Sequence, residues 1–123
     1  MAVIESTEKR NYIHMLKLAC TVPHAATVLS YTTAKWITGY VDRVVFVPAT
    51  AATPPSSGFD FTLTDNDGVD ILKGGGSSCS ATITTDLYPD YSLNSKLTLA
   101  IGAAGTNGSQ GYVKIFWREG ENG

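Results

Sequence analysis

The sequence contains little of what disulfide-stabilised, metal-binding or highly charged proteins require. Its 123 residues include two cysteines and two histidines, and charged residues make up 16% of the chain, below the roughly one quarter that is typical. A single possible disulfide, between Cys20 and Cys79, is too few for a secreted domain that depends on disulfides. We therefore expect both cysteines to be free and mostly buried. The length fits one domain with a sizeable core.

The chain also lacks an excess of positive charge, a long hydrophobic segment and a leader-like start. Its formal net charge is −2, whereas nucleic-acid binding usually requires a concentrated basic face. No apolar run is long enough to cross a membrane, and the first ten residues hold four charged side chains in place of the apolar core of a signal peptide. These absences predict a protein without nucleic-acid or membrane partners.

Catalytic and metal-binding patterns are weak. Neither histidine, His14 or His24, has a Glu or a second His at a metal-binding spacing, and no fixed nucleophile motif is present. The segment 60–72, DFTLTDNDGVDIL, carries four aspartates, but no EF-hand register places oxygen ligands at the required positions. Asp60 and Asp70 resemble solvated residues rather than an acid held in an apolar cleft. We expect no catalytic residue, metal or cofactor.

The aspartate-rich segment is instead typical of a β-hairpin. FDFTLT and VDILK alternate in polarity, and DNDG joins them. Asp and Asn bond nearby backbone N–H groups in turns, and Gly68 can adopt a positive φ. The pattern predicts a type I turn with a glycine bulge, and it places Phe59, Phe61 and Leu63 inward.

Period-two alternation dominates the chain, and no segment of ten or more residues has a helical period. Strands are predicted near residues 12–20, 26–32, 39–48, 59–64, 69–73, 81–85, 95–101 and 112–118. About eight short strands between turn-rich segments predict an all-β fold. The expected architecture is a single antiparallel β-sandwich or jelly-roll-like domain over residues 12–119. An N-terminal arm over 1–11 precedes it, and a tail over 120–123 follows.

Three strands carry explicit predictions of which side chains share a face. Within 39–48, Tyr40, Val44 and Phe46 are expected on one face, and Val41, Val45 and Val47 are expected on the other. Within 95–101, the alternation sets Leu97, Leu99 and Ile101 against Lys96, Thr98 and Ala100. Within 112–118, it sets Val113, Ile115 and Trp117 against Tyr112, Lys114 and Phe116.

Candidate binding residues lie in the arm and in the connections. Val3 and Ile4, followed by Lys9 and Arg10, are suited to extending the sheet of a neighbouring molecule by strand addition. The aromatic residues Trp36, Tyr88 and Tyr91 fall in or near predicted connections. They are candidates for a protein interface or for stacking on sugars, or they pack over an open end of the sandwich.

Three stretches of the sequence, GYVDRVVFVPATAATPPSSGFDFTLTDNDGVDIL, NSKLTLAIGAAG and GYVKIFWRE, resemble small proteins encoded among the virion genes of tailed bacteriophages. The resemblance covers residues 38–119. It implies a non-enzymatic capsid decoration or cement protein that binds the major capsid protein on the capsid exterior. Symmetric copies would add avidity, so we expect a dimer or trimer. A neck or tail accessory module and a carbohydrate-binding β-sandwich remain the alternatives.

Overall fold

The computed structural model describes residues 3–10, 13–21, 29–50, 53–55, 57–102 and 110–118. His24, the first part of the strand predicted over 26–32 and the tail 120–123 lie outside these ranges. The described part of the chain is all β and contains nine strands. Within it there is no helix suited to crossing a membrane.

The strands alternate with turns along the whole of the described chain. Their bounds are β1 Val3–Arg10, β2 Ile13–Thr21, β3 Leu29–Thr32, β4 Ile37–Pro48, β5 Asp60–Thr64, β6 Thr85–Leu87, β7 Tyr91–Ser95, β8 Thr98–Gly102 and β9 Gln110–Arg118. They form a six-stranded sheet in the order β1-β2-β9-β4-β6, with β7 also paired to β4, and a three-stranded sheet in the order β3-β8-β5. All pairs are antiparallel.

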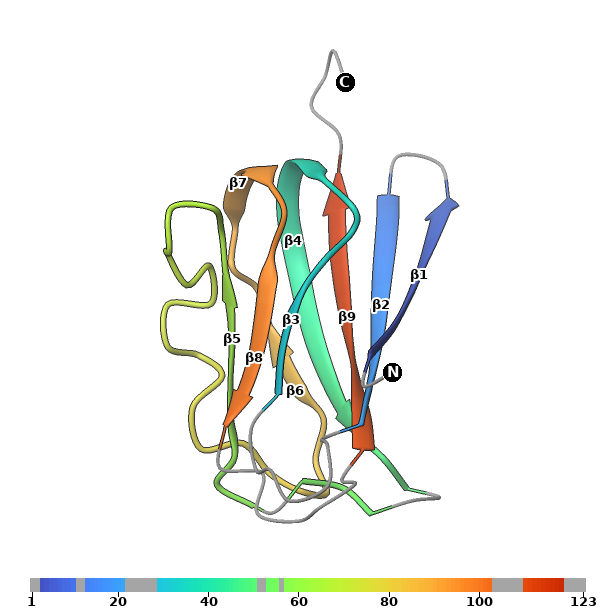
Figure 1. Cartoon of the computed structure of the whole chain (residues 1–123), viewed down its shortest axis with the longest axis vertical. Coiled ribbons are helices and arrows are strands. Elements are labelled where there is room, and N and C mark those ends of the chain that lie inside the picture. Colours follow the sequence, from blue (N-terminus) through green and yellow to red (C-terminus); the bar gives the residue numbers. More distant parts are fainter. Residues whose placement is uncertain are drawn as a thin grey trace.

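The two sheets lie one in front of the other, with β3, β8 and β5 before β4 and its neighbours (Figure 1). This arrangement confirms the all-β prediction and is that of a β-sandwich. The jelly-roll order of strands stays a prediction. The large sheet ends at β1, which pairs only with β2 among the described strands and leaves its other edge open.

Alternating side chains from both sheets build the core, as the sequence predicts. Phe59 and Leu63 are fully buried and Phe61 is 1% exposed, and the Phe46 ring packs against those of Phe59 and Phe61 with centroids 4.8 and 5.2 Å apart. In two further segments that were predicted to alternate, one of the two sets is buried, namely Leu97, Leu99 and Ile101 in 95–101 and Val113, Ile115 and Trp117 in 112–118. The period of two thus placed these three segments correctly.

A β-bulge changes the facing of residues in β4. The pairing of β4 with β9 shifts between Val41, which lies opposite Trp117, and Arg43, which lies opposite Phe116. Asp42 is the extra residue, so the alternation is reset there. Val41 is consequently fully buried on the same side as Val44, and its predicted place on the opposite face is wrong.

The aspartate-rich segment forms the predicted turn. The Asp65 N–H donates to the Val69 carbonyl at 2.9 Å, and the Gly68 N–H donates to the Asp65 carbonyl at 3.0 Å. Gly68 has a φ of 81°, and Asp65 Oδ1 accepts the N–H groups of Asp67 and Val69. The aspartate therefore acts as a turn-former, as its position in DNDG indicates.

The second arm of the predicted hairpin is absent as a strand. Only an isolated bridge joins Thr64 to Asp70, and β5 pairs with β8 instead. The reason lies at Asp70, whose Oδ1 accepts the N–H groups of Leu63 and Leu72 while its carbonyl accepts that of Lys73. These local bonds turn the chain away from a ladder.

A similar local bond displaces the strand predicted over 81–85. Ser80 Oγ accepts the N–H groups of Thr82 and Ile83 at 3.1 and 3.0 Å, which withdraws both groups from sheet pairing. β6 begins only at Thr85. Residues 86–94, for which no strand was predicted, hold the rest of β6 and most of β7, which spans Tyr91–Ser95.

Polar side chains link the two sheets on both sides of the sandwich. On β1, Glu5 Oε1 accepts the Tyr31 hydroxyl at 2.6 Å and the Ala34 N–H at 2.9 Å, and Oε2 accepts the Lys35 N–H at 3.0 Å. On the other side, the hydroxyl of Tyr91 on β7 donates to Asp65 Oδ2 at 3.0 Å. Glu5 thereby links β1 to β3 and to the segment after it, and Tyr91 links β7 to the segment after β5.

These contacts also define the N-terminal segment. Residues 3–10 of the predicted arm pair with β2 along their whole length, from Val3 opposite Cys20 to Arg10 opposite Ile13. Together with the Glu5 contacts, this pairing makes the described part of the arm an edge strand of the sandwich.

Candidate interaction surfaces

The residues predicted for partner binding separate into exposed and inward-facing groups. Ile4 is 66% exposed, Trp36 is 50% exposed and Tyr88 is 66% exposed, whereas Val3 is 2% exposed. Tyr91 is half-buried and packs against the core. Val3 and Tyr91 therefore hold the sandwich together, and the other three present apolar surface to solvent.

Trp36 and Tyr88 are each fixed by a hydrogen bond to a strand residue. The Trp36 indole N–H donates to Asn94 Oδ1 at 2.8 Å, and the Tyr88 hydroxyl donates to Asp86 Oδ2 at 3.2 Å. The same Asp86 carboxylate pairs with the Arg43 guanidinium through two bonds of 2.8 and 3.0 Å. The two rings are held by different strands and make no stacking contact with each other, so they are separate anchors rather than one aromatic cluster.

The outer face of the large sheet, defined here as the side chains of β1, β2, β9, β4 and β6 that point away from the core, is rich in cations. It holds five of the nine Lys and Arg residues of the chain, which are Arg10, Lys17, Arg43, Lys114 and Arg118. The described acidic side chains beside them are Glu8, Asp42, Asp86 and Asp90, the last of which lies near Arg118 and Tyr40. This face is thus net positive on a chain whose net charge is −2.

Aromatic rings separate these cations. The Nζ atoms of Lys17 and Lys114 lie 4.5 and 5.4 Å from the centroid of the Tyr112 ring, and Arg43 lies 5.6 Å from that of Phe116. Such cation–π contacts hold the charged groups close to the sheet. They leave the ammonium groups at the surface with capacity to bind a partner.

Two ion pairs neutralise one end of this face. Arg43 pairs with Asp86 at 2.8 Å, and the Arg118 guanidinium donates to both Asp42 oxygens, at 2.6 and 2.9 Å. The Arg43 guanidinium, through its hydrogen bonds, is the main cause of the lowered pKa of Asp86. The positive charge that remains unpaired on the described outer face therefore lies toward β1 and β2.

A shallow groove of about 420 Å³ crosses β1, β2 and β9 in this less neutralised region. Ile13, Met15 and Phe116 supply its apolar surface, and Arg10, Lys114 and Glu8 supply its charged groups. Ile13 is 48% exposed. Of the residues predicted for binding, only Arg10 lines the groove. The other lining residues were not predicted, because which side chains of three strands share a surface depends on the strand order β1-β2-β9.

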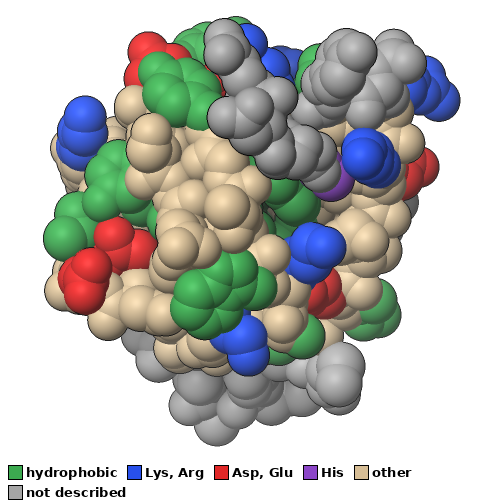
Figure 2. Space-filling model, turned by 90° about the horizontal axis from the view of Figure 1, so that it is seen from above, with side chains coloured by type: hydrophobic (Ala, Val, Ile, Leu, Met, Phe, Trp, Pro, Cys, Tyr) green, Lys and Arg blue, Asp and Glu red, His purple; other side chains and the backbone are tan. Residues whose placement is uncertain are grey.

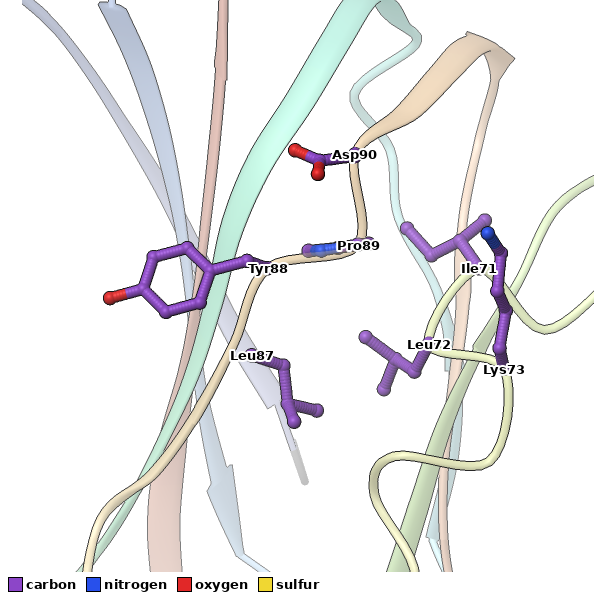
Figure 3. A pocket seen from close by; sticks show the side chains of 7 residues that line it. All are labelled: Ile71, Leu72, Lys73, Leu87, Tyr88, Pro89 and Asp90. Carbon is purple, nitrogen blue, oxygen red and sulfur yellow. The ribbon is translucent and has the colours of Figure 1, made fainter.

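A second hollow, of about 330 Å³, lies between residues 71–73 and 87–90. Figure 3 shows Leu72 and Leu87 facing each other across it, while the Tyr88 ring points away. Lys73 and Asp90 on its rim have φ values of 53° and 50°, which are uncommon for residues other than glycine. Its leucine walls suit an apolar group rather than acid–base chemistry.

The remaining candidates for chemistry have structural roles. Asp70 Oδ2 accepts the Gly74 N–H and Asp60 Oδ1 accepts the Ser78 N–H, so both carboxylates bind backbone. Within the described ranges, no cluster of three His, Cys, Asp or Glu side chains is arranged to hold a metal. His14 stacks on Trp117 with ring centroids 5.0 Å apart.

Both cysteines are free and buried, as predicted. Burial raises the pKa of the Cys20 thiol to about 12, and burial is also the main cause of the raised pKa of Cys79. Because the thiolate is the reactive form, neither residue is suited to nucleophilic or redox chemistry.

Comparison with known proteins assigns the chain to no protein family. A scan against protein-family models found no matching family, and a search of curated proteins found no match. The described chain is an all-β protein built from two antiparallel sheets. Its function has to be argued from the surfaces described above.

Proposed function

We propose that this protein is a non-enzymatic virion structural protein of a tailed bacteriophage, a decoration or cement protein that binds the major capsid protein. The observation that carries the proposal is the pair of exposed but fixed aromatic side chains, Trp36 and Tyr88. An aromatic ring that is already held in place loses little conformational entropy on binding, and Trp and Tyr are enriched among the residues that dominate interface energies.

The fold supports a role in which the protein reinforces a shell. Hydrogen bonds link the two sheets on both sides of the sandwich, through Glu5 on one side and Asp65 with Tyr91 on the other. A scaffold fixed in this way presents its anchors without rearranging, so binding energy goes to the partner contact. The resemblance of residues 38–119 to phage virion proteins is the reason for proposing that the shell is a phage capsid.

The test is binding to undecorated capsids. We expect saturable binding with hundreds of copies per particle, and capsids that withstand a higher temperature once decorated. Trp36→Ala and Tyr88→Ala should each weaken binding by about tenfold or more, as loss of an aromatic anchor typically does. Ile83→Ala is the matched control, because Ile83 is 69% exposed and its side chain has no polar atom with which to fix it.

Two results would count against the proposal. Absence of capsid binding at micromolar concentration would remove the decoration role. A dozen copies or fewer per imaged particle would assign the protein to a neck or tail position instead.

A further inference from the structure

The groove on the outer face has the shape and charge of a docking site. Its apolar surface comes from Ile13, Met15 and Phe116, and its charged groups are the cations Arg10 and Lys114 and the single carboxylate of Glu8. Neither cation is paired with a described carboxylate, whereas Arg43 and Arg118 farther along the sheet are paired. An occupant that complements this apolar surface and its surplus of one positive charge would supply an apolar side chain beside a carboxylate.

The chain itself carries such a segment. In the turn 65–70, Val69 is 45% exposed and lies among three of the four aspartates of the segment 60–72. The carboxylate oxygens of Asp65 and Asp70 accept hydrogen bonds from backbone N–H groups and from the Tyr91 hydroxyl. Asp67 is exposed, and its carboxylate has no described hydrogen-bond partner. The turn thus offers one free carboxylate two residues from an exposed valine.

The turn is rigid and faces away from the groove of its own molecule. Its backbone is closed by the bond from Asp65 N–H to Val69 C=O, and Tyr91 holds Asp65 from β7. Figure 1 places the turn after β5 at the upper left and the adjoining ends of β1 and β2 at the upper right. The two sites therefore lie at the same end of the sandwich on opposite edges.

Figure 2 looks onto this end of the molecule. Acidic and hydrophobic side chains adjoin at its left edge, where a Lys or Arg side chain also lies, and further acidic side chains stand among the cations elsewhere on this face. One copy thus presents a turn with an exposed carboxylate and, at a different place, a groove lined by two cations.

We propose that this chain associates head to tail with a second copy, the turn 65–70 of one molecule docking in the groove of the next. Val69 enters between Ile13 and Phe116, and Asp67 pairs with Lys114 or Arg10 at the rim. Because the two surfaces differ, the contact is heterologous, and it closes into a ring when the rotation between copies permits. This inference does not depend on the capsid role.

The experiment exchanges the charges of two residues and measures the mass of the assembly in solution. Wild-type protein is expected to give a mass above that of the monomer in sedimentation equilibrium at tens to hundreds of micromolar, and added salt is expected to lower it. Lys114→Glu and Asp67→Lys should each weaken association by about tenfold or more, since each places like charges together. The Asp67→Lys, Lys114→Glu double variant should regain association, because the exchanged charges again attract.

Lys96→Glu provides the matched control, since it makes the same charge change at a residue outside the groove. Circular dichroism and the unfolding midpoint confirm that each variant is folded. A wild-type protein that stays monomeric at several hundred micromolar overturns the proposal, as does a double variant no better than its parents. If Lys114→Glu abolishes capsid binding without changing the mass, the groove is occupied by the coat and the self-association is refuted.

Discussion

The contact of Glu5 with the segment after β3 is the most testable feature of the fold. Its carboxylate accepts three hydrogen bonds, from the Tyr31 hydroxyl and from the N–H groups of Ala34 and Lys35. Replacing Glu5 by alanine removes all three hydrogen bonds, and with them the side-chain link between β1 and the small sheet. We therefore expect Glu5→Ala to lower the free energy of unfolding far more than an ordinary substitution on an edge strand.

The magnitude follows from the exposure of the site. A hydrogen bond to a charged group contributes about 1.5–3 kcal/mol when it is well buried, but water can replace Glu5 at the two partly exposed N–H groups. Taking about 1 kcal/mol for each of the three bonds gives about 3 kcal/mol. For a domain of this size that corresponds to a fall of about 10 °C in the unfolding midpoint. Glu5→Gln, which keeps one acceptor oxygen, should lie between Glu5→Ala and the wild type.

The assay is urea and thermal unfolding, with amide hydrogen exchange to locate the effect. Glu8→Ala is the control, because Glu8 lies on the same strand but points to the outer face, where it makes no described hydrogen bond. It should change stability by no more than about 0.5 kcal/mol. Exchange should accelerate first in β1 of Glu5→Ala. Equal destabilisation by Glu5→Ala and Glu8→Ala would refute the idea that Glu5 ties the two sheets together.

Three further predictions concern the turn, the thiols and the bulged strand. The Val69 N–H, together with the Tyr91 hydroxyl, lowers the pKa of Asp65. The ionised carboxylate therefore stabilises the fold above the unfolded pKa of about 4, and this stabilisation is lost as the pH falls. The unfolding midpoint of Asp65→Asn should thus depend less on pH below 5 than that of the wild type. Cys20 and Cys79 should react with a thiol reagent only after unfolding, and rapid reaction of the native protein would contradict their burial. Gly39 has a φ of 148°, and a Cβ there would collide with the Arg118 carbonyl. Gly39→Ala should therefore lower the free energy of unfolding by about 2–4 kcal/mol in urea unfolding. Gly58→Ala, at a residue with open space around it, should lower it less.

The sequence predicted those features that depend on local alternation. Strands β5, β8 and β9 carry their apolar residues at every second position, and those side chains are buried. It failed where one residue changes the register or a polar side chain competes for the backbone. The bulge at Asp42 inverted the expected facing of Val41, and Ser80 and Asp70 bound N–H groups that strands would have needed. Such competition depends on which partner is near, and alternation does not reveal it.

The candidate surface was predictable only in part, for a different reason. Trp36 and Tyr88 stand out as single aromatic residues near connections, so composition and position suffice to find them. The cations of the outer face come from sequence positions as distant as 10, 17, 43 and 114, and they meet only because β9 lies between β2 and β4. Nothing in the local pattern specifies that order, since it is set by which pairings bury the most apolar surface. The nearly neutral composition therefore does not reveal the small excess of positive charge on the outer face, and partner predictions made from net charge apply to the whole chain and not to its faces.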